Sequence, residues 1–133
     1  MLGFIASRLK YENVTARIRG KNFRLMKADT FIKRAIGLMY RDGIPKDGGM
    51  LFVLKEPSRQ GIWMKNMRFP IDIIWVGGDM LVCDTLSSVK PCRDLDCKVY
   101  RPNRTARFVL ELKAGSCRRL SIKPGSKVRL ESV

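Results

Sequence analysis

Apolar and polar residues alternate along several short segments of this chain, chiefly near its two ends. The alternation covers residues 14–18, 23–25, 106–113 and 127–131. Successive side chains of a β-strand point to opposite faces of the sheet, so a period of two predicts strands with one buried and one exposed face. The chain is therefore expected to fold mainly into β-sheet.

The middle of the chain adds short apolar runs that predict buried strands. These runs cover residues 50–54, 61–64, 71–76 and 80–86. Helical spacing occurs over residues 31–39, after Asp29 or Thr30, either of which can cap a first turn. About eight short strands, one α-helix near residues 30–40 and no alternation of strands with long helices favour a mostly antiparallel β barrel or sandwich.

A length of 133 residues suits one domain that spans residues 1–133. Apolar residues make up 45% of the chain and charged residues 29%, which is the usual mixture of a globular protein. No apolar run approaches the roughly 20 residues that a membrane helix needs, and residues 1–10 lack the cleavage site of a secretory signal. We expect a cytoplasmic protein without membrane insertion.

The chain contains no histidine. This absence excludes the Ser-His-Asp and Cys-His nucleophile systems and nearly all common zinc or iron sites. The glycine-rich segments 47–49 and 77–79 lack the glycine spacing of a phosphate or dinucleotide loop. We therefore expect no metal and no cofactor, and we favour a binding protein over an enzyme while leaving both open.

Positive charge is concentrated at the two ends of the chain. Lys and Arg number 27 against 12 Asp and Glu, giving a net charge of +15. Residues 1–41 carry ten basic and two acidic side chains, and so do residues 98–133, whereas residues 42–97 carry seven and eight. If the two ends lie side by side, their charges merge into one basic face suited to RNA, DNA or another polyanion. The candidate contacts are Arg17, Arg19, Arg24, Arg34, Arg41, Arg107, Lys127 and Arg129.

A second group of polar residues could form a small-molecule pocket. Asp72 lies in an otherwise apolar run, so its carboxylate serves either as a ligand anchor or general base, or as a hydrogen-bonded structural group. Trp63 and Lys65 share a strand face and could stack on a planar anion, although a Trp of this kind can equally belong to the core. Asn66 could bind the same ligand or hold a turn.

Glu111 completes the candidate pocket of Trp63, Lys65, Asn66, Asp72 and Glu111. One interpretation places Glu111 in an exposed row of ion pairs with Arg107 and Lys113 on the polar face of its strand. The alternative pairs Glu111 with Asp72 for acid/base work. Alternation along the strand does not decide between them.

Two of the four cysteines could form a disulfide. Cys92 and Cys97 flank the short polar loop 93–96, which could bring their sulfur atoms within bonding reach. In a reducing cytosol, two free thiols are the alternative. Both possibilities stay open from the sequence.

Seven motifs occur together over most of the chain. They are Ala28-Asp29-Thr30, residues 34–41 (RAIGLMYR), residues 49–52 (GMLF), residues 63–66 (WMKN), residues 70–74 (PIDII), Pro91-Cys92 and residues 108–115 (FVLELKAG). In this order they resemble DUF family 192, a domain of unknown function, over about residues 22–131. The resemblance implies a compact, mainly β fold with one helix near its start, and it implies no particular activity.

Three functions are compatible with these features. The first is a non-enzymatic module that binds an anionic ligand, such as RNA or DNA, through a basic face. The second is a small-molecule-binding protein or enzyme built around the five candidate pocket residues. The third is an accessory factor that contacts another protein, for example through an exposed β edge. The excess of positive charge favours the first.

Overall fold

The computed structural model describes residues 2–132 and confirms a mainly β fold. In this part of the chain nine strands accompany three short helices. The elements are α1 (Leu2–Arg8), β1 (Asn13–Ile18), β2 (Lys21–Ala28), α2 (Phe31–Ile36), β3 (Gly48–Ser58), β4 (Ile62–Trp63), β5 (Ile71–Val76), β6 (Val82–Val89), β7 (Val99–Tyr100), β8 (Ala106–Lys113), α3 (Ser116–Leu120) and β9 (Val128–Ser132). The predicted helix is α2. The helices α1 and α3, of seven and five residues, were not predicted, because so short a segment shows no clear period, whereas the spacing that predicted α2 continues past Ile36 to Met39.

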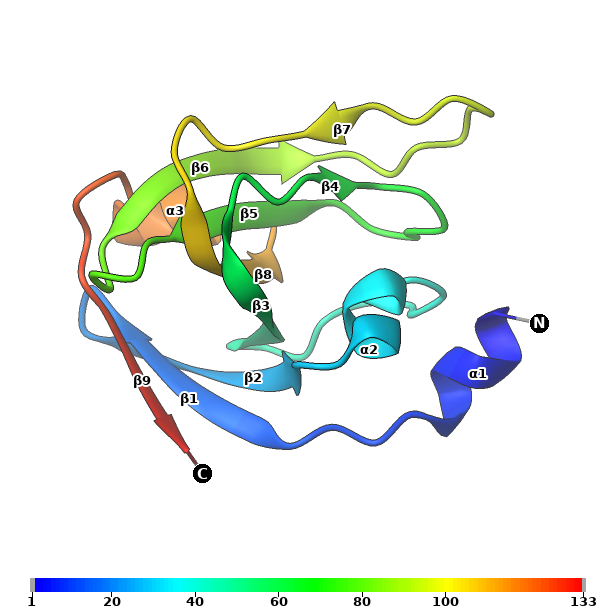
Figure 1. The fold of residues 1–133 in the computed structure, drawn as a ribbon, viewed down its shortest axis with the longest axis horizontal. Helices are drawn as coiled ribbons and strands as arrows, with labels where there is room; N and C mark the ends of the chain where they lie inside the picture. The colour runs from blue at the N-terminus through cyan, green and yellow to red at the C-terminus, as the bar shows by residue number, and fades with distance from the viewer. Residues whose placement is uncertain (1, 133) are drawn as a thin grey trace.

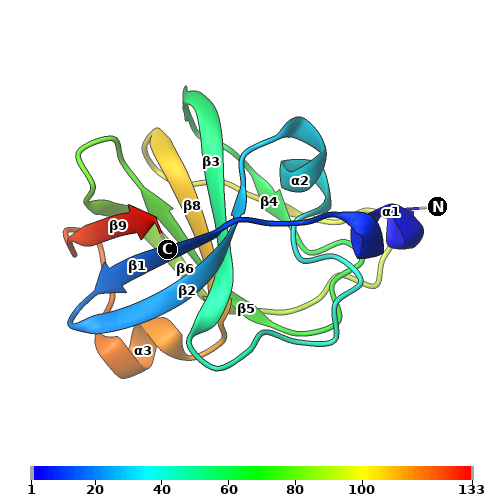
Figure 2. The same ribbon diagram turned by 90° about the horizontal axis from the view of Figure 1, so that it is seen from below.

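Seven strands form one curled sheet, in the order β6-β5-β8-β3-β2-β1-β9 (Figure 1). All neighbouring pairs in it are antiparallel except β2 and β3, which run parallel because α2 and the segment after it carry the chain across. The sheet curls into a half-barrel whose edges meet at one end. There Leu81 bridges Lys127, and the Val128 amide donates to the Met80 carbonyl over 2.9 Å (Figure 2).

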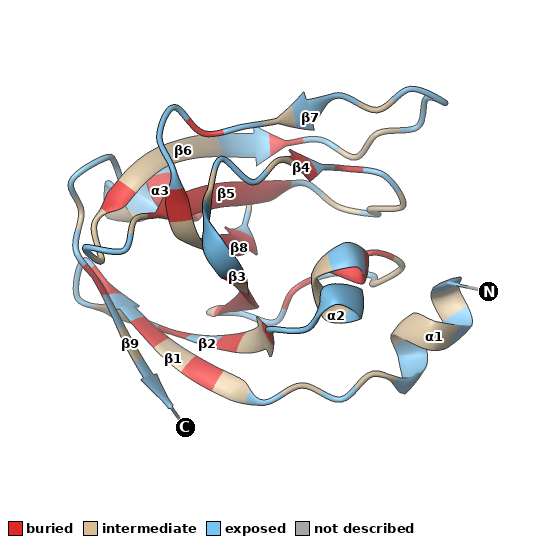
Figure 3. Ribbon diagram, in the orientation of Figure 1, coloured by how far each residue is buried: buried red, intermediate tan, exposed pale blue. Residues whose placement is uncertain are grey.

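The concave face of the curled sheet encloses one hydrophobic core. Alternating residues of the strands point into it, including the fully buried Phe23, Leu25, Ile74 and Leu110. Cys117 of α3 belongs to the same core. Figure 3 shows the buried residues concentrated along the central strands. The alternation in the sequence thus marks the inward face of the half-barrel.

The opposite face of β3, β5 and β8 carries a second core. It is covered by α2, the segment that follows α2, and a small two-stranded sheet of β4 and β7 (Figure 1). Trp75 is fully buried there and donates from its indole nitrogen to the Gln60 carbonyl over 3.0 Å. Because both faces of β5 are covered, all six of its residues are buried, and its sequence shows a continuous apolar run apart from Asp72.

The ends of α2 are defined by local chemistry. The Thr30 hydroxyl accepts a hydrogen bond from the Lys33 amide over 3.3 Å, which caps the first turn. Gly37 ends the helix with a φ of 53°, and a Cβ at this position would approach the Phe52 ring to 3.1 Å. The chain can therefore turn closely over β3 after α2, and this segment forms one wall of the site described below.

A disulfide joins Cys92 and Cys97, whose Cα atoms lie 5.8 Å apart across the loop 93–96. The Cys92 amide donates to the Met64 carbonyl over 3.0 Å, so the loop is attached to the segment that follows β4. Of the helices in residues 2–132, none has the length and the apolar character needed to cross a membrane.

Candidate functional site

The second core contains a cavity of about 490 Å³, which we call the α2 cavity. Its walls come from α2 and the turn after it, from Phe52 and Leu54 of β3, from residues 60–63 around β4, from residues near β7, and from Glu111 of β8. A volume of this size lies within the range of small-molecule sites. Three of its large apolar lining side chains are exposed, namely Phe31, Trp63 and Val99, and they mark the mouth.

Glu111 lies at the buried end of the α2 cavity. It is 4% exposed, and its register partners on the neighbouring strands are Met50 of β3 and Ile73 of β5, both fully buried. Its carboxyl has no hydrogen-bond or ion-pair partner among residues 2–132, and its oxygens are not completely shielded from solvent. Burial raises the pKa of Glu111 from its ordinary 4.5 to about 8. At neutral pH this carboxyl is mostly protonated and can donate a hydrogen bond.

The expected row of exposed ion pairs around Glu111 is wrong. The prediction assumed that one face of β8 meets solvent, but the layer formed by α2, β4 and β7 covers the face that carries Glu111. Arg107 of the same strand donates from its guanidinium to the Leu54 carbonyl of β3 instead of pairing with Glu111. Alternation in a sequence cannot reveal a second layer contributed by distant segments.

Asp72 lies on the other face of the same sheet. It is fully buried and accepts hydrogen bonds from three backbone amides: Ser88 over 2.8 Å, Gly115 over 3.2 Å and Cys117 over 2.8 Å. Its register partner is Leu112, whereas Glu111 is opposite Ile73. The structure therefore does not bring Asp72 and Glu111 together as a carboxylate pair.

The amides around Asp72 connect β5 to the end of β6 and to the start of α3. Burial, the charge of Asp72 and a hydrogen bond to Asp72 raise the pKa of the Cys117 thiol to about 12. A thiol with so high a pKa stays protonated and is a poor nucleophile. Asp72 thus has a structural role, since it joins β5 to β6 and to the start of α3 through hydrogen bonds.

The remaining pocket candidates lie around the mouth. Trp63 is 44% exposed, and the Lys65 ammonium lies 5.2 Å from the centre of its ring. Asn66 has a φ of 60°, and its carbonyl accepts from the Tyr40 amide over 2.9 Å, so it holds a turn beside the cavity. Of the five candidates, Trp63 and Glu111 line the cavity, Lys65 contacts Trp63, and Asp72 belongs to the opposite face.

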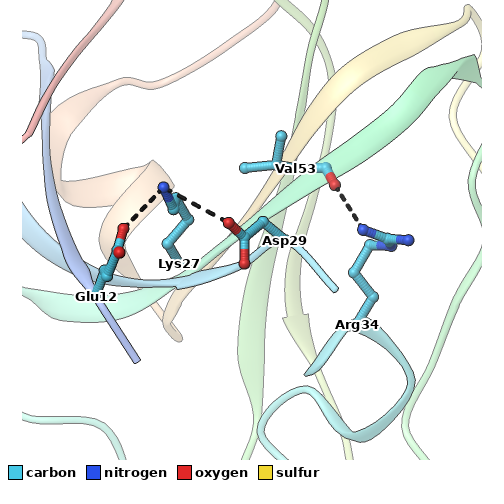
Figure 4. A network of polar contacts seen from close by, with 5 residues as sticks. All are labelled: Glu12, Lys27, Asp29, Arg34 and Val53. Atoms are coloured by element: carbon cyan, nitrogen blue, oxygen red, sulfur yellow. Dashed lines mark hydrogen bonds and ion pairs between the residues drawn. The ribbon is translucent and has the colours of Figure 1, made fainter. Parts of the chain in front are cut away.

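Two arginines line the α2 cavity. Arg34 of α2, a predicted contact of the basic face, donates to the Val53 carbonyl over 3.2 Å (Figure 4). Arg101, just after β7, donates to the Arg59 carbonyl over 3.1 Å. Arg101 was not predicted from the sequence, because a strand of two residues leaves no periodic signal and the approach of β7 to β4 is a long-range contact.

An ion-pair network stands just before α2. The Lys27 ammonium contacts the Glu12 carboxylate at 3.0 Å and the Asp29 carboxylate at 3.6 Å (Figure 4). The hydrogen bond to Glu12 is the main reason that the pKa of Lys27 is raised. These contacts join the segment before β1 to the end of β2, next to the start of α2.

A second concave region lies where the two ends of the chain meet. β1 and β9 are antiparallel neighbours, with Arg17 opposite Arg129, so the two basic end segments do lie side by side. Arg17, Arg19, Lys127 and Arg129 line an open groove of about 480 Å³, together with Asp79, Met80, Leu81 and Val128. We call this region the basic groove.

The other predicted anion contacts are dispersed. Arg24 is exposed on β2, opposite Thr15 in the register with β1. Arg41 lies 5.6 Å from the Tyr11 ring, Arg34 lines the α2 cavity, and Arg107 contacts Leu54. Half of the eight candidates therefore line the basic groove.

Sequence similarity covers nearly the whole chain. The profile of the DUF192 family, described as an uncharacterized ACR, matches residues 14–130. A UPF0127 protein of Pyrococcus furiosus is 34% identical over 120 residues, which are 87% of this chain and 93% of that protein. These matches confirm the resemblance drawn from the seven motifs.

Two solved structures share the fold. A protein of Sinorhizobium meliloti 1021, described as a candidate transcription regulator, is 27% identical with a TM-score of 0.84, and the match covers 92% of this chain and 96% of that one. A protein of unknown function from Novosphingobium aromaticivorans DSM 12444 is 34% identical with a TM-score of 0.81, and the match covers 92% of this chain and 87% of that one.

Proposed function

This chain belongs to the DUF192 family, and we propose that it is a binding protein that holds a small molecule in the α2 cavity. The observation that carries the proposal is Glu111, a carboxyl that is 4% exposed, lines the cavity and has no protein partner among residues 2–132. Its carboxyl oxygens keep some contact with solvent through the cavity, because no side-chain nitrogen or oxygen among residues 2–132 is both fully buried and without a partner. A ligand that fills the cavity can supply the missing partner.

The composition of the walls supports binding in preference to catalysis. In the described lining of the α2 cavity the charged or titratable side chains are Arg34, Arg101 and Glu111. General acid/base catalysis usually needs a second proton-transferring group within reach of the first. The other buried carboxyl, Asp72, occupies the opposite face of the sheet. One protonated acid and two fixed cations suit recognition of a ligand.

The neutral dye phenylnaphthylamine, which fluoresces in apolar surroundings, tests this proposal. Saturable binding of one dye per chain is expected. Ala35→Trp should abolish it, because Ala35 is exposed and lines the cavity, so the larger ring obstructs the site while leaving the cores intact. Ser87→Trp, on an exposed position of β6 outside the cavity, is the matched control. Dye binding that is absent, or that is equal in the wild type and Ala35→Trp, contradicts the proposal.

The basic groove supports a second candidate function, the binding of RNA, DNA or another polyanion. The observation in its favour is the register of Arg17 with Arg129, which joins cations from both ends of the chain on one surface. Phosphate contacts by such side chains give an affinity that falls steeply with salt. Fluorescence anisotropy with short RNA and DNA at two salt concentrations measures this dependence. Affinity that does not change with salt contradicts the polyanion function.

A further inference from the structure

The α2 cavity differs chemically between its buried end and its mouth. Glu111 at the buried end is 4% exposed, whereas Trp63 and Val99 at the mouth are 44% and 45% exposed. Arg101 is also exposed and lines the same mouth. The positive charge therefore stands nearer to solvent than the carboxyl does, and a ligand with two different ends has one preferred orientation.

The walls between the two ends are apolar. The buried apolar residues that line the cavity are Ile36 at the end of α2, Leu38 just after it, Phe52 and Leu54 of β3, and Ile62 of β4. Removing apolar surface of a ligand from water against such walls contributes roughly 25 cal/mol for each Å². The body of the ligand is thus a hydrocarbon or aromatic group. An inorganic anion has no apolar surface to bury against these walls.

Arg34 and Arg101 are fixed in place but not neutralised. Each donates one hydrogen bond to a backbone carbonyl, Arg34 to Val53 and Arg101 to Arg59. Neither forms an ion pair with a carboxylate among residues 2–132, in contrast to Arg68, which pairs with Asp42 at 2.8 Å. A guanidinium has five N–H donors, so several donors of each remain free. Such groups bind a carboxylate by charge-assisted hydrogen bonds.

Glu111 adds a requirement at the buried end. Its neighbours in the sheet, Met50 and Ile73, carry no hydrogen-bonding side chain, so the acceptor for its proton comes from what occupies the cavity, solvent or ligand. A negative group placed beside it would lie far from solvent, whereas a neutral oxygen can accept the hydrogen bond without burying a charge. The acceptor at the buried end is therefore uncharged.

We propose that the ligand of the α2 cavity is an amphipathic organic acid, with its carboxylate at Arg34 and Arg101, an apolar body along the walls, and a neutral hydrogen-bond acceptor next to Glu111. This inference rests on the proposed small-molecule function and specifies the class of ligand. It requires no chemical step, because the acid is bound and released unchanged.

Displacement of phenylnaphthylamine by matched ten-carbon compounds tests the class of ligand. Decanoate should displace the dye at a concentration about tenfold or more below that of decanol or decyltrimethylammonium, because it alone forms charge-assisted hydrogen bonds with the arginines. Arg34→Gln and Arg101→Gln should weaken the binding of decanoate about tenfold more than the binding of decanol. Arg68→Gln, on a paired arginine outside the cavity lining, is the matched control and should change neither.

The buried end is tested with ω-hydroxydecanoate. Its terminal hydroxyl can accept the proton of Glu111, so it should bind several-fold more tightly than decanoate. Glu111→Leu should remove this preference for the hydroxyl, and Glu111→Gln, which keeps a donor, should retain it. Equal binding of decanoate, decanol and the cation, or a hydroxyl preference that survives Glu111→Leu, overturns this inference. Absence of dye binding instead overturns the proposed function, so the two failures are distinguishable.

Discussion

Asp72 and Glu111 lie on neighbouring strands of one sheet, yet their carboxyls point to opposite faces of it. The register of β5 with β8 sets this arrangement, because Asp72 is opposite Leu112 and Ile73 is opposite Glu111. Asp72 accepts hydrogen bonds from three backbone amides, whereas the carboxyl of Glu111 has no hydrogen-bond partner among residues 2–132. Two buried acids in the same sheet therefore have separate roles, one in the fold and one in the α2 cavity.

Asp72→Asn should destabilise the fold strongly. The side chain of Asn has one acceptor oxygen where Asp has two, so it can accept fewer of the three backbone hydrogen bonds. Its NH2 group would face a backbone N–H, and two donors cannot bond to each other. We expect a loss on the order of 3 kcal/mol in the free energy of unfolding, measured by urea denaturation. Asp42→Asn, which removes one exposed ion pair with Arg68, should cost less than about 1 kcal/mol. Equal effects of the two substitutions would contradict a structural role for Asp72.

Glu111 should make the fold less stable as the pH rises from about 4.5 to about 8. The raised pKa means that the folded chain holds the Glu111 proton over this range while the unfolded chain releases it. The contribution of Glu111 is full below pH 4.5 and falls by about 1.4 kcal/mol per pH unit until pH 8. The charged groups that share the cavity with it are Arg34 of α2 and Arg101 after β7.

Urea denaturation of the wild type and Glu111→Gln at several pH values isolates this effect. The stability difference should shift in favour of Glu111→Gln by several kcal/mol in total between pH 4.5 and pH 8. Glu131→Gln is the matched control, because Glu131 is exposed and paired with Arg129 at 2.8 Å. A stability difference that stays constant with pH would show that Glu111 ionises normally in the folded chain.

The strands of the half-barrel and the helix α2 could be predicted from the sequence, because their evidence is local, whereas the sequence left a barrel and a sandwich both open. Residues 14–18 alternate in sequence and in burial, with Val14, Ala16 and Ile18 pointing into the core of the half-barrel. Thr30 predicts the start of α2, because its hydroxyl can cap the first turn. In each case neighbouring residues along the chain carry the signal.

The α2 cavity could be predicted only in part. Trp63 and Glu111 were recognised as candidates, but Arg101 and the burial of Glu111 depend on β7 pairing with β4 over the outer face of the sheet. Such a contact joins segments about 40 residues apart, Arg59 with Arg101 for example. No periodic pattern encodes it, since β4 and β7 have two residues each.

Reduction of the disulfide should loosen one side of the α2 cavity. Cys92 donates from its amide to Met64, close to Trp63, and Cys97 lies two residues before β7. Closing so short a loop contributes about 2 kcal/mol. We expect Cys92→Ser with Cys97→Ser to lower the free energy of unfolding by about that amount and to weaken dye binding. Cys83→Ser, on a free cysteine, is the control. Unchanged dye binding in the double variant would show that the disulfide does not hold the shape of the α2 cavity.

Removing charge from the basic groove should weaken polyanion binding and make it less dependent on salt. Arg17 and Arg129 are opposite each other on β1 and β9, so Arg17→Glu with Arg129→Glu places two negative charges where two cations stood. Each lost phosphate contact reduces the slope of log affinity against log salt by roughly 0.7 to 0.9. Fluorescence anisotropy with short RNA and DNA measures this slope.

The matched control changes the net charge equally at a distance from the groove. Arg68→Glu with Lys90→Glu reverses two exposed cations that do not line the basic groove. If polyanions bind in the groove, this control keeps most of the affinity, while the groove variant loses it and both keep the wild-type circular dichroism spectrum. If the two double variants lose affinity equally, the binding follows the net charge of +15 alone, and the groove is not a site.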